Sequence, residues 1–165
     1  MPTPTALPST FTANTVLPAA SLNLLRGGFR VLQVIAAATT TQTGKSNATY
    51  GTSTLTATIT PQAATNKVLV MYTQQCSTDT ANGQLGLRLV QRIGASDTVI
   101  QTNTYALLNS AGSMYGIYAQ NVLVSPNSTS AVTYFTEMAL TGGGGNVYTQ
   151  TGGTTSNIIL MEISA

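Results

Sequence analysis

The sequence predicts an all-β protein: an antiparallel β-sandwich of about 8-9 strands in jelly-roll-like order, preceded by an extended Pro-rich N-terminal arm. Short segments alternate between apolar and polar residues, as strands do when one face is buried and the other is wet. Clusters of Gly, Asn, Ser and Pro separate these segments about every 8 to 15 residues. Nowhere does a helical period persist for three turns. A plain immunoglobulin-like Greek key is the alternative topology.

Residues 1–27 predict an extended arm that ends in a short helical turn. Proline at positions 2, 4, 8 and 18 favours a polyproline-like path with few ladder hydrogen bonds. Ser21 can cap a turn over Ser21–Arg26, which the glycines at 27 and 28 would end. The arm is either a loose terminus or a segment that docks on another protein. We favour docking because apolar side chains recur along it, and we expect these to bind the partner: Leu7, Phe11, Val16, Leu17, Leu22, Leu24 and Leu25.

Residues 28–165 predict the sandwich domain, and its first half contains the clearest strands. The expected strands are 29–37, 54–60, 67–76 and 84–93. In the second of these, Leu55, Ala57 and Ile59 alternate with Thr until Pro61 ends the strand. Residues 67–76 carry apolar side chains on both faces, which is typical of a central strand or of a subunit contact. In 84–93, Leu85, Leu87 and Leu89 should face the core, and Asn82-Gly83 predicts a hairpin turn before them.

The second half predicts further strands at 97–103, 115–124, 131–140, 146–150 and 157–163. Residues 104–113 show no clean period and are expected to form a surface loop. The four glycines at 142–145 form either a flexible tip or a hairpin in which two backbones approach closely, and no lysine follows them as a phosphate-binding loop requires. Glu162 lies in an apolar run, so we expect it to face an edge or to be paired, for instance with an Arg.

Composition excludes several classes of function. Only 6% of the residues are charged, and the net charge of +2 comes from scattered residues rather than a basic stripe, so nucleic-acid binding is not expected. No apolar run is long enough to span a membrane, and the N-terminus is a poor signal peptide. The single cysteine, Cys76, excludes an internal disulfide. A surface this poor in charge suits packing against copies or partners.

The sequence shows no catalytic constellation, so we expect no enzyme. It has no histidine, which is the usual general base and the commonest zinc ligand. The acids are Asp79, Asp97, Glu137 and Glu162, and nothing in their spacing brings two together for glycoside hydrolysis. The carboxylate clustering of a calcium loop is missing as well. We therefore expect no cofactor and no metal.

From about Leu55 onward the sequence resembles a β-sandwich domain of tailed, cyanophage-like bacteriophages, found in capsid decoration (cement) proteins and in the distal parts of head or tail fibres. The segments that carry the resemblance are TLTATITPQAATNKVLV, LGLRLVQRIG followed by TVIQTN, and TTSNIILMEISA. They cover roughly two thirds of the chain. The resemblance implies a virion surface protein, and because many members are trimeric it also implies a homotrimer.

Two functions remain open. As a capsid decoration protein, the chain would trimerise on the outer capsid surface after synthesis in the host cytoplasm, and its arm would bind the major capsid protein and stabilise the shell. As a receptor-binding fibre protein, its loops would bind host glycan through Tyr and Asn side chains. Those residues are Tyr105, Tyr115, Tyr118, Asn103 and Asn109. We favour decoration because a fibre normally carries a stalk, and only about 27 residues precede the expected sandwich.

Overall fold

The computed structural model describes residues 30–108 and 112–165. The predicted arm, its helical turn and its seven apolar anchor residues lie outside the described residues, as do Phe29 and Asn109. Within them the chain forms ten strands and one short 3-10 helix. The elements are β1 (Val31–Thr39), β2 (Thr43–Lys45), β3 (Gly51–Ile59), β4 (Lys67–Thr78), β5 (Gln84–Ile93), β6 (Ser96–Leu108), β7 (Met114–Val124), β8 (Val132–Gly142), β9 (Val147–Thr149), η1 (Thr151–Gly153) and β10 (Ser156–Ile163).

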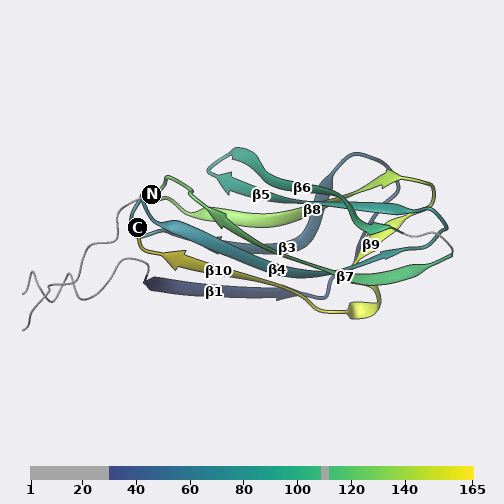
Figure 1. Ribbon diagram of the computed structural model, residues 1–165, viewed down its shortest axis with the longest axis horizontal. Helices are drawn as coiled ribbons and strands as arrows, with labels where there is room; N and C mark the ends of the chain where they lie inside the picture. Colours follow the sequence, from purple (N-terminus) through teal and green to yellow (C-terminus); the bar gives the residue numbers. More distant parts are fainter. Residues whose placement is uncertain (1–29, 109–111) are drawn as a thin grey trace, which may run out of the picture.

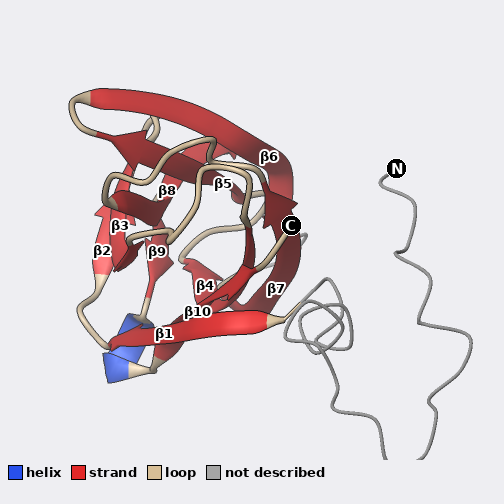
Figure 2. Ribbon diagram, turned by 90° about the vertical axis from the view of Figure 1, so that its left-hand side faces the viewer, coloured by secondary structure: helices blue, strands red, loops and turns tan. Residues whose placement is uncertain are grey.

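The strands form two antiparallel sheets that pack face to face, as predicted (Figure 1). The six-stranded sheet has the order β1-β10-β4-β9-β2, with β7 paired to the other edge of β4. The four-stranded sheet has the order β3-β8-β5-β6. Figure 2 shows the two layers from the end of the sandwich, with β1, β10, β4 and β7 in one and β3, β8, β5 and β6 in the other.

The eight long strands pair as one long hairpin folded on itself. The first pairs with the last (β1 with β10), and then β3 pairs with β8, β4 with β7, and β5 with β6. This nested pairing is the double Greek key of a jelly roll. The fold class is therefore confirmed. The structure has one strand more than the nine expected, because the three-residue β2 is too short to show a period in sequence.

The core lies between the sheets in two apolar clusters. Residues predicted to face inward do so: Leu85, Leu87 and Leu89 of β5 are at most 1% exposed. Along β4 the inward side chains pass from Tyr72 in the first cluster through buried Gln74 to Cys76 in the second. Polar side chains line this transition, where Ser53 accepts a hydrogen bond from Gln74 and bonds Thr136. These hydrogen bonds between buried polar groups lower the cost of burying the polar band.

The expected loop at 104–113 is wrong in its first half, because β6 continues to Leu108. Its pairing with β5 shifts register between Leu85 and Leu87, so one residue of β5, Gly86, lies opposite three residues of β6. A bulge of this kind inserts residues into the strand and interrupts the alternation from which a strand is predicted.

The glycines at 142–145 form a close approach, which is one of the two interpretations left open. Gly143 and Gly145 have φ angles of 73° and 79°. A Cβ at Gly143 would collide with the backbone of Asn82, and one at Gly145 would collide with Thr80. Only glycine therefore fits where the β8–β9 connection packs against the β4–β5 turn.

Glu162 is buried and paired, although not with an Arg and not at an edge. β10 lies between β1 and β4, and the Glu162 carboxylate points into the end of the sandwich. Its oxygens accept hydrogen bonds from Gln33 Nε2 at 2.5 Å, the backbone N–H of Gln62 at 2.7 Å and Asn66 Nδ2 at 2.5 Å. Three amide donors replace the expected cation.

Candidate interaction surface

The outer side of the six-stranded sheet carries a continuous surface of apolar and neutral side chains, which we call the apolar face. It is built by β1, β10, β4 and β7, and the register of these strands fixes which side chains point outward. Its residues are Val31, Val34, Ala36, Ala38, Asn157, Ile159, Met161, Ile163, Leu69, Met71, Thr73, Tyr115, Ile117, Ala119, Asn121 and Leu123.

Rows of side chains cross this face at right angles to the strands. One row consists of Val34, Met161, Leu69 and Leu123, one residue from each strand. Residues opposite each other in neighbouring strands lie on the same side of a sheet, so these four side chains form an unbroken apolar line. The neighbouring row, two residues further along each strand, consists of Ala36, Ile159, Met71 and Asn121.

The same strands bury their alternate residues in the core, which explains why the face exists. In β4, Val68, Val70 and Tyr72 are at most 4% exposed, while Leu69 and Met71 lie half-buried on the other side. A strand apolar on both sides at the centre of a sheet needs cover on both sides. The core covers one side, and within the described residues no element lies over Leu69 or Met71.

The exposed apolar side chains concentrate at the two margins of the face. On β1, Val31 and Val34 are 54% and 51% exposed, and on β7, Tyr115, Ile117 and Leu123 are 66%, 76% and 52% exposed. Single exposed apolar residues are ordinary on a protein surface, but contiguous ones indicate an interaction site.

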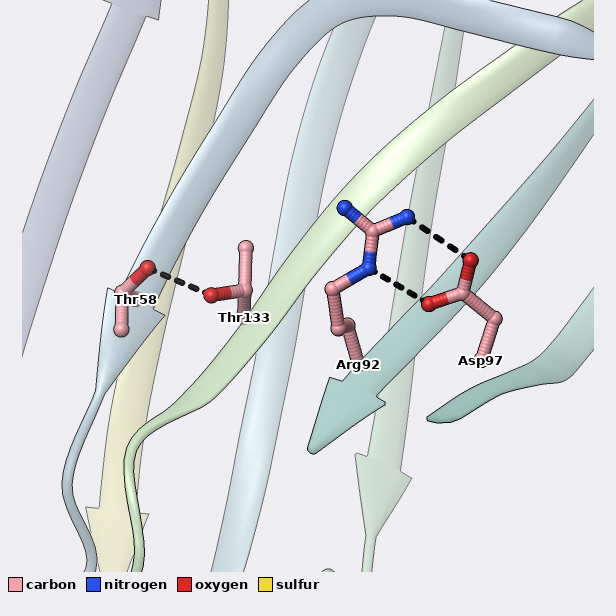
Figure 3. A network of polar contacts seen from close by, with 4 residues as sticks. All are labelled: Thr58, Arg92, Asp97 and Thr133. Carbon is pink, nitrogen blue, oxygen red and sulfur yellow. Dashed lines mark hydrogen bonds and ion pairs between the residues drawn. The ribbon is translucent and has the colours of Figure 1, made fainter. Parts of the chain in front are cut away.

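The outer side of the four-stranded sheet is different, because ion pairs and hydroxyl groups lie beside its apolar residues, among them Val90, Val99 and Phe135. Figure 3 shows one row across it, Thr58, Thr133, Arg92 and Asp97, from the four successive strands. Thr58 and Thr133 are hydrogen-bonded at 2.8 Å, and Arg92 binds both carboxylate oxygens of Asp97 at 2.6 and 2.7 Å. The hydrogen bonds from Arg92 lower the pKa of Asp97.

Two arginine side chains on this side, Arg88 and Arg92, each lie over an aromatic ring. Arg88 pairs with Glu137 at 2.5 Å, and its guanidinium lies 4.5 Å from the centre of the Tyr50 ring. Arg92 lies in the same way 4.8 Å from the Phe135 ring. Ion pairs and cation–π contacts of this kind suit a surface that faces water.

Charge therefore divides the two outer sides of the sandwich. Among the described residues of β1, β10, β4 and β7, the register places one charged side chain on the apolar face, that of Lys67 at its end. The four-stranded sheet carries Arg88, Arg92, Asp97 and Glu137 on its outer side. The sandwich thus has one side suited to solvent and one suited to contact with another surface.

Those residues expected to bind glycan that the structure describes do not form one platform. Tyr115 points outward from β7 and Tyr118 points inward, where its ring packs 6.1 Å from that of Tyr72. Asn103 bonds its neighbours, since its Nδ2 donates to the Tyr118 hydroxyl at 2.9 Å and its Oδ1 accepts from the Tyr105 N–H at 3.0 Å. Polar groups already paired inside the protein have little left to offer a sugar. Asn103, Tyr105, Tyr115 and Tyr118 also lie on strands, not on loops.

No acidic or sulfur cluster in the described part of the chain, residues 30–108 and 112–165, brings together three potential ligands for a metal ion. Over the same residues, no helix has both the length and the apolarity needed to cross a membrane. Cys76 is fully buried, and this burial raises the pKa of its thiol to about 12.

Comparisons with known proteins find distant likenesses in fold. No protein family model matches the chain, and no curated protein does either. Among solved structures, the chain is similar to infectious bursal disease virus of the Gx strain (15% identity, TM-score 0.46, covering 84% of this chain and 37% of the other). It is also similar to the Gt strain (13%, 0.45, covering 96% and 42%) and to the VP2 subviral particle of that virus (11%, 0.40, covering 81% and 40%). The chain thus spans about two fifths of the solved chains it matches.

Proposed function

We propose that this chain is a structural virion protein, a capsid decoration (cement) protein that trimerises on the outside of a bacteriophage head and stabilises the shell through its N-terminal arm. The observation that carries the proposal is the apolar face, set opposite a side of the sandwich that is furnished with ion pairs. A protein that is held permanently in an assembly can keep such a face buried, whereas a free monomer would expose it to water. The resemblance to phage decoration proteins points the same way.

In this arrangement the two parts of the chain have separate tasks. The sandwich provides a rigid body with one contact face and one solvent face. Residues 1–27 would run over the major capsid protein, with Leu7, Phe11, Val16, Leu17, Leu22, Leu24 and Leu25 as anchors. An extended segment binds through backbone groups and through pockets for spaced side chains. Many such contacts on one shell would add through avidity, even if each is weak.

Receptor binding is the less favoured function, because Tyr115 and Tyr118 lie on opposite sides of β7 and Asn103 is already hydrogen-bonded to Tyr118. It remains the alternative outcome of the experiment below.

Immunogold labelling of intact particles tests the location directly. An antibody raised against residues 28–165 should place gold over the whole head in many copies. Label confined to the tail or to a few fibres would overturn decoration and favour receptor binding.

Deleting residues 1–20 tests the role of the arm. The shortened chain should keep its sandwich, seen as an unchanged β-type circular dichroism spectrum, and should no longer bind particles that lack the protein. Binding that persists after the deletion would show that the arm is not the anchor. A chain that no longer folds would show that residues 1–20 belong to the sandwich.

A further inference from the structure

We propose that the apolar face is the surface through which this chain binds a second copy of itself. The proposed trimer needs a contact between subunits, and the apolar face would supply it. The inference rests on the proposed function only for the number of copies that associate. The contact is formed by the outward side chains of β1, β10, β4 and β7, with Val34, Ile117 and Leu123 among its most exposed members.

The chemistry of the face is compatible with an identical surface. When copies meet, like charges in the contact repel each other, so a face that contacts a copy of its own chain is best built without them. The apolar face has a single charge, that of Lys67 at its end. The polar groups within it are the amides of Asn121 and Asn157 and the hydroxyls of Thr73 and Tyr115. Amides and hydroxyls each donate and accept, so each can bond its counterpart in a second copy, which a carboxylate or an ammonium group cannot do.

A foreign partner would be recognised differently. Contacts between different proteins commonly gain specificity and association rate from opposite charges on the two surfaces. This chain places its exposed ion-pairing residues on the other side of the sandwich, where Arg92 and Asp97 already neutralise each other. The charge pattern therefore favours a copy over a charged partner.

The size of the face fits one such contact. Four strands about 4.8 Å apart, with outward rows spanning about 20 Å, give a flat area of about 400 Å². Side-chain relief raises the accessible area above that value, toward the roughly 800 Å² per partner of a standard interface. Two sheets that meet face to face interdigitate their side chains about 10 Å apart, as the two layers inside this sandwich do.

The exposed residues lie at both margins of the face, on β1 and on β7, with half-buried residues between them. A face that meets its equivalent around a two-fold axis would use both margins at once, which gives a dimer. A β7 margin that meets the β1 margin of the next copy would instead close a ring, as a trimer requires. Both arrangements bury the exposed residues of the β1 and β7 margins, and they are distinguished by the number of copies.

The test measures self-association of the full chain without particles. Sedimentation velocity is run over a concentration series for the wild type, for Ile117→Lys, and for Leu123→Lys as a second variant. Thr56→Lys is the matched control, because it adds the same charge at an exposed position on the outer side of the four-stranded sheet. Circular dichroism and the urea midpoint confirm that each variant is folded.

We expect the wild type to form dimers or trimers, the two face variants to associate at least about tenfold more weakly, and the control to behave as the wild type. A wild type that stays monomeric throughout overturns the inference. So does association that Ile117→Lys and Leu123→Lys leave unchanged, or that Thr56→Lys weakens equally. A dimer supports the contact and overturns the trimer in the proposed function. If the chain forms a trimer but immunogold labelling does not find it on phage heads, the contact is supported and the decoration role is overturned.

Discussion

Replacing Glu162 with Gln tests whether the buried carboxylate holds one end of the sandwich together. The carboxylate joins three segments, since Gln33 belongs to β1 while Gln62 and Asn66 lie in the β3–β4 connection. In Glu162→Gln, one acceptor oxygen becomes an NH₂ group that must face a donor. Gln33 cannot turn its amide to compensate without losing the hydrogen bond that its Nε2 gives to the Thr60 carbonyl at 2.8 Å.

The cost can be estimated from these hydrogen bonds. A hydrogen bond to a charged group contributes about 1.5–3 kcal/mol and a neutral one about 0.5–1.5 kcal/mol, so losing one and weakening two removes roughly 3–5 kcal/mol. A neutral side chain is easier to bury than a carboxylate, which reduces the net loss to about 2–4 kcal/mol. For a chain of this length, that loss lowers the melting temperature by roughly 5–15 °C.

The difference between the two proteins should depend on pH with a definite sign. Burial raises the pKa of Glu162, but the hydrogen bonds from Asn66, Gln33 and the Gln62 backbone outweigh it and hold the pKa below the ordinary value of 4.5. A group whose pKa is lower in the folded state stabilises fully above the unfolded pKa and loses that effect as the pH falls through the folded pKa. The stability gap should therefore be constant at neutral pH and should shrink below about 4.5.

Urea unfolding of both proteins at equal concentration, from pH 7 to pH 3, measures this gap. The other carboxylates titrate alike in both proteins, so they cancel in the difference. Equal stability at pH 7, or a gap that stays constant to pH 3, would refute the structural role assigned to the carboxylate.

Three further substitutions or probes check other parts of the structure. Gly143→Ala should destabilise the protein by more than about 1 kcal/mol, because its Cβ would collide with Asn82 at a positive φ, whereas Gly144→Ala, whose Cβ meets nothing, should be near neutral; urea midpoints compare the pair. Leu87→Ala should cost about 2–5 kcal/mol by opening a cavity in the second cluster, and a loss under 1 kcal/mol would mean that the site is not packed as described. Cys76 should not react with a thiol reagent at pH 8 until denaturant is added, since its thiol is buried and its pKa is raised to about 12; rapid labelling of the native protein would contradict this.

Strand positions could be predicted wherever the alternation was uninterrupted. β3 shows this most clearly, because Leu55, Ala57 and Ile59 are buried and the Thr residues between them are exposed. The same method missed the end of β6, where a bulge shifts the register, and β2, which is too short to have a period. Both failures have the same physical cause: alternation reports a regular strand, and irregular or very short strands are held by their partners.

The apolar face could be anticipated only in part. Residues 67–76 show apolar side chains on both sides, which indicated a central strand or a subunit contact, and β4 is central. The face itself arises because Val34, Met161, Leu69 and Leu123 come into one row from four strands that are far apart in sequence. No local pattern specifies which strands will be neighbours, since that follows from the nested pairing of the whole chain. The role of residues 1–27 stays a prediction.

The position of β10 has a consequence for how the protein is made. Ser156–Ile163 leave the ribosome after every other described strand, yet they form a central strand between β1 and β4. Until they emerge, β1 has no partner in its sheet and one edge of β4 is unpaired. The growing chain therefore exposes unpaired strand edges and part of its core, which favours aggregation. The sandwich must therefore close after synthesis of β10, and translation that stops short of residue 156 should yield aggregates, not a smaller folded domain.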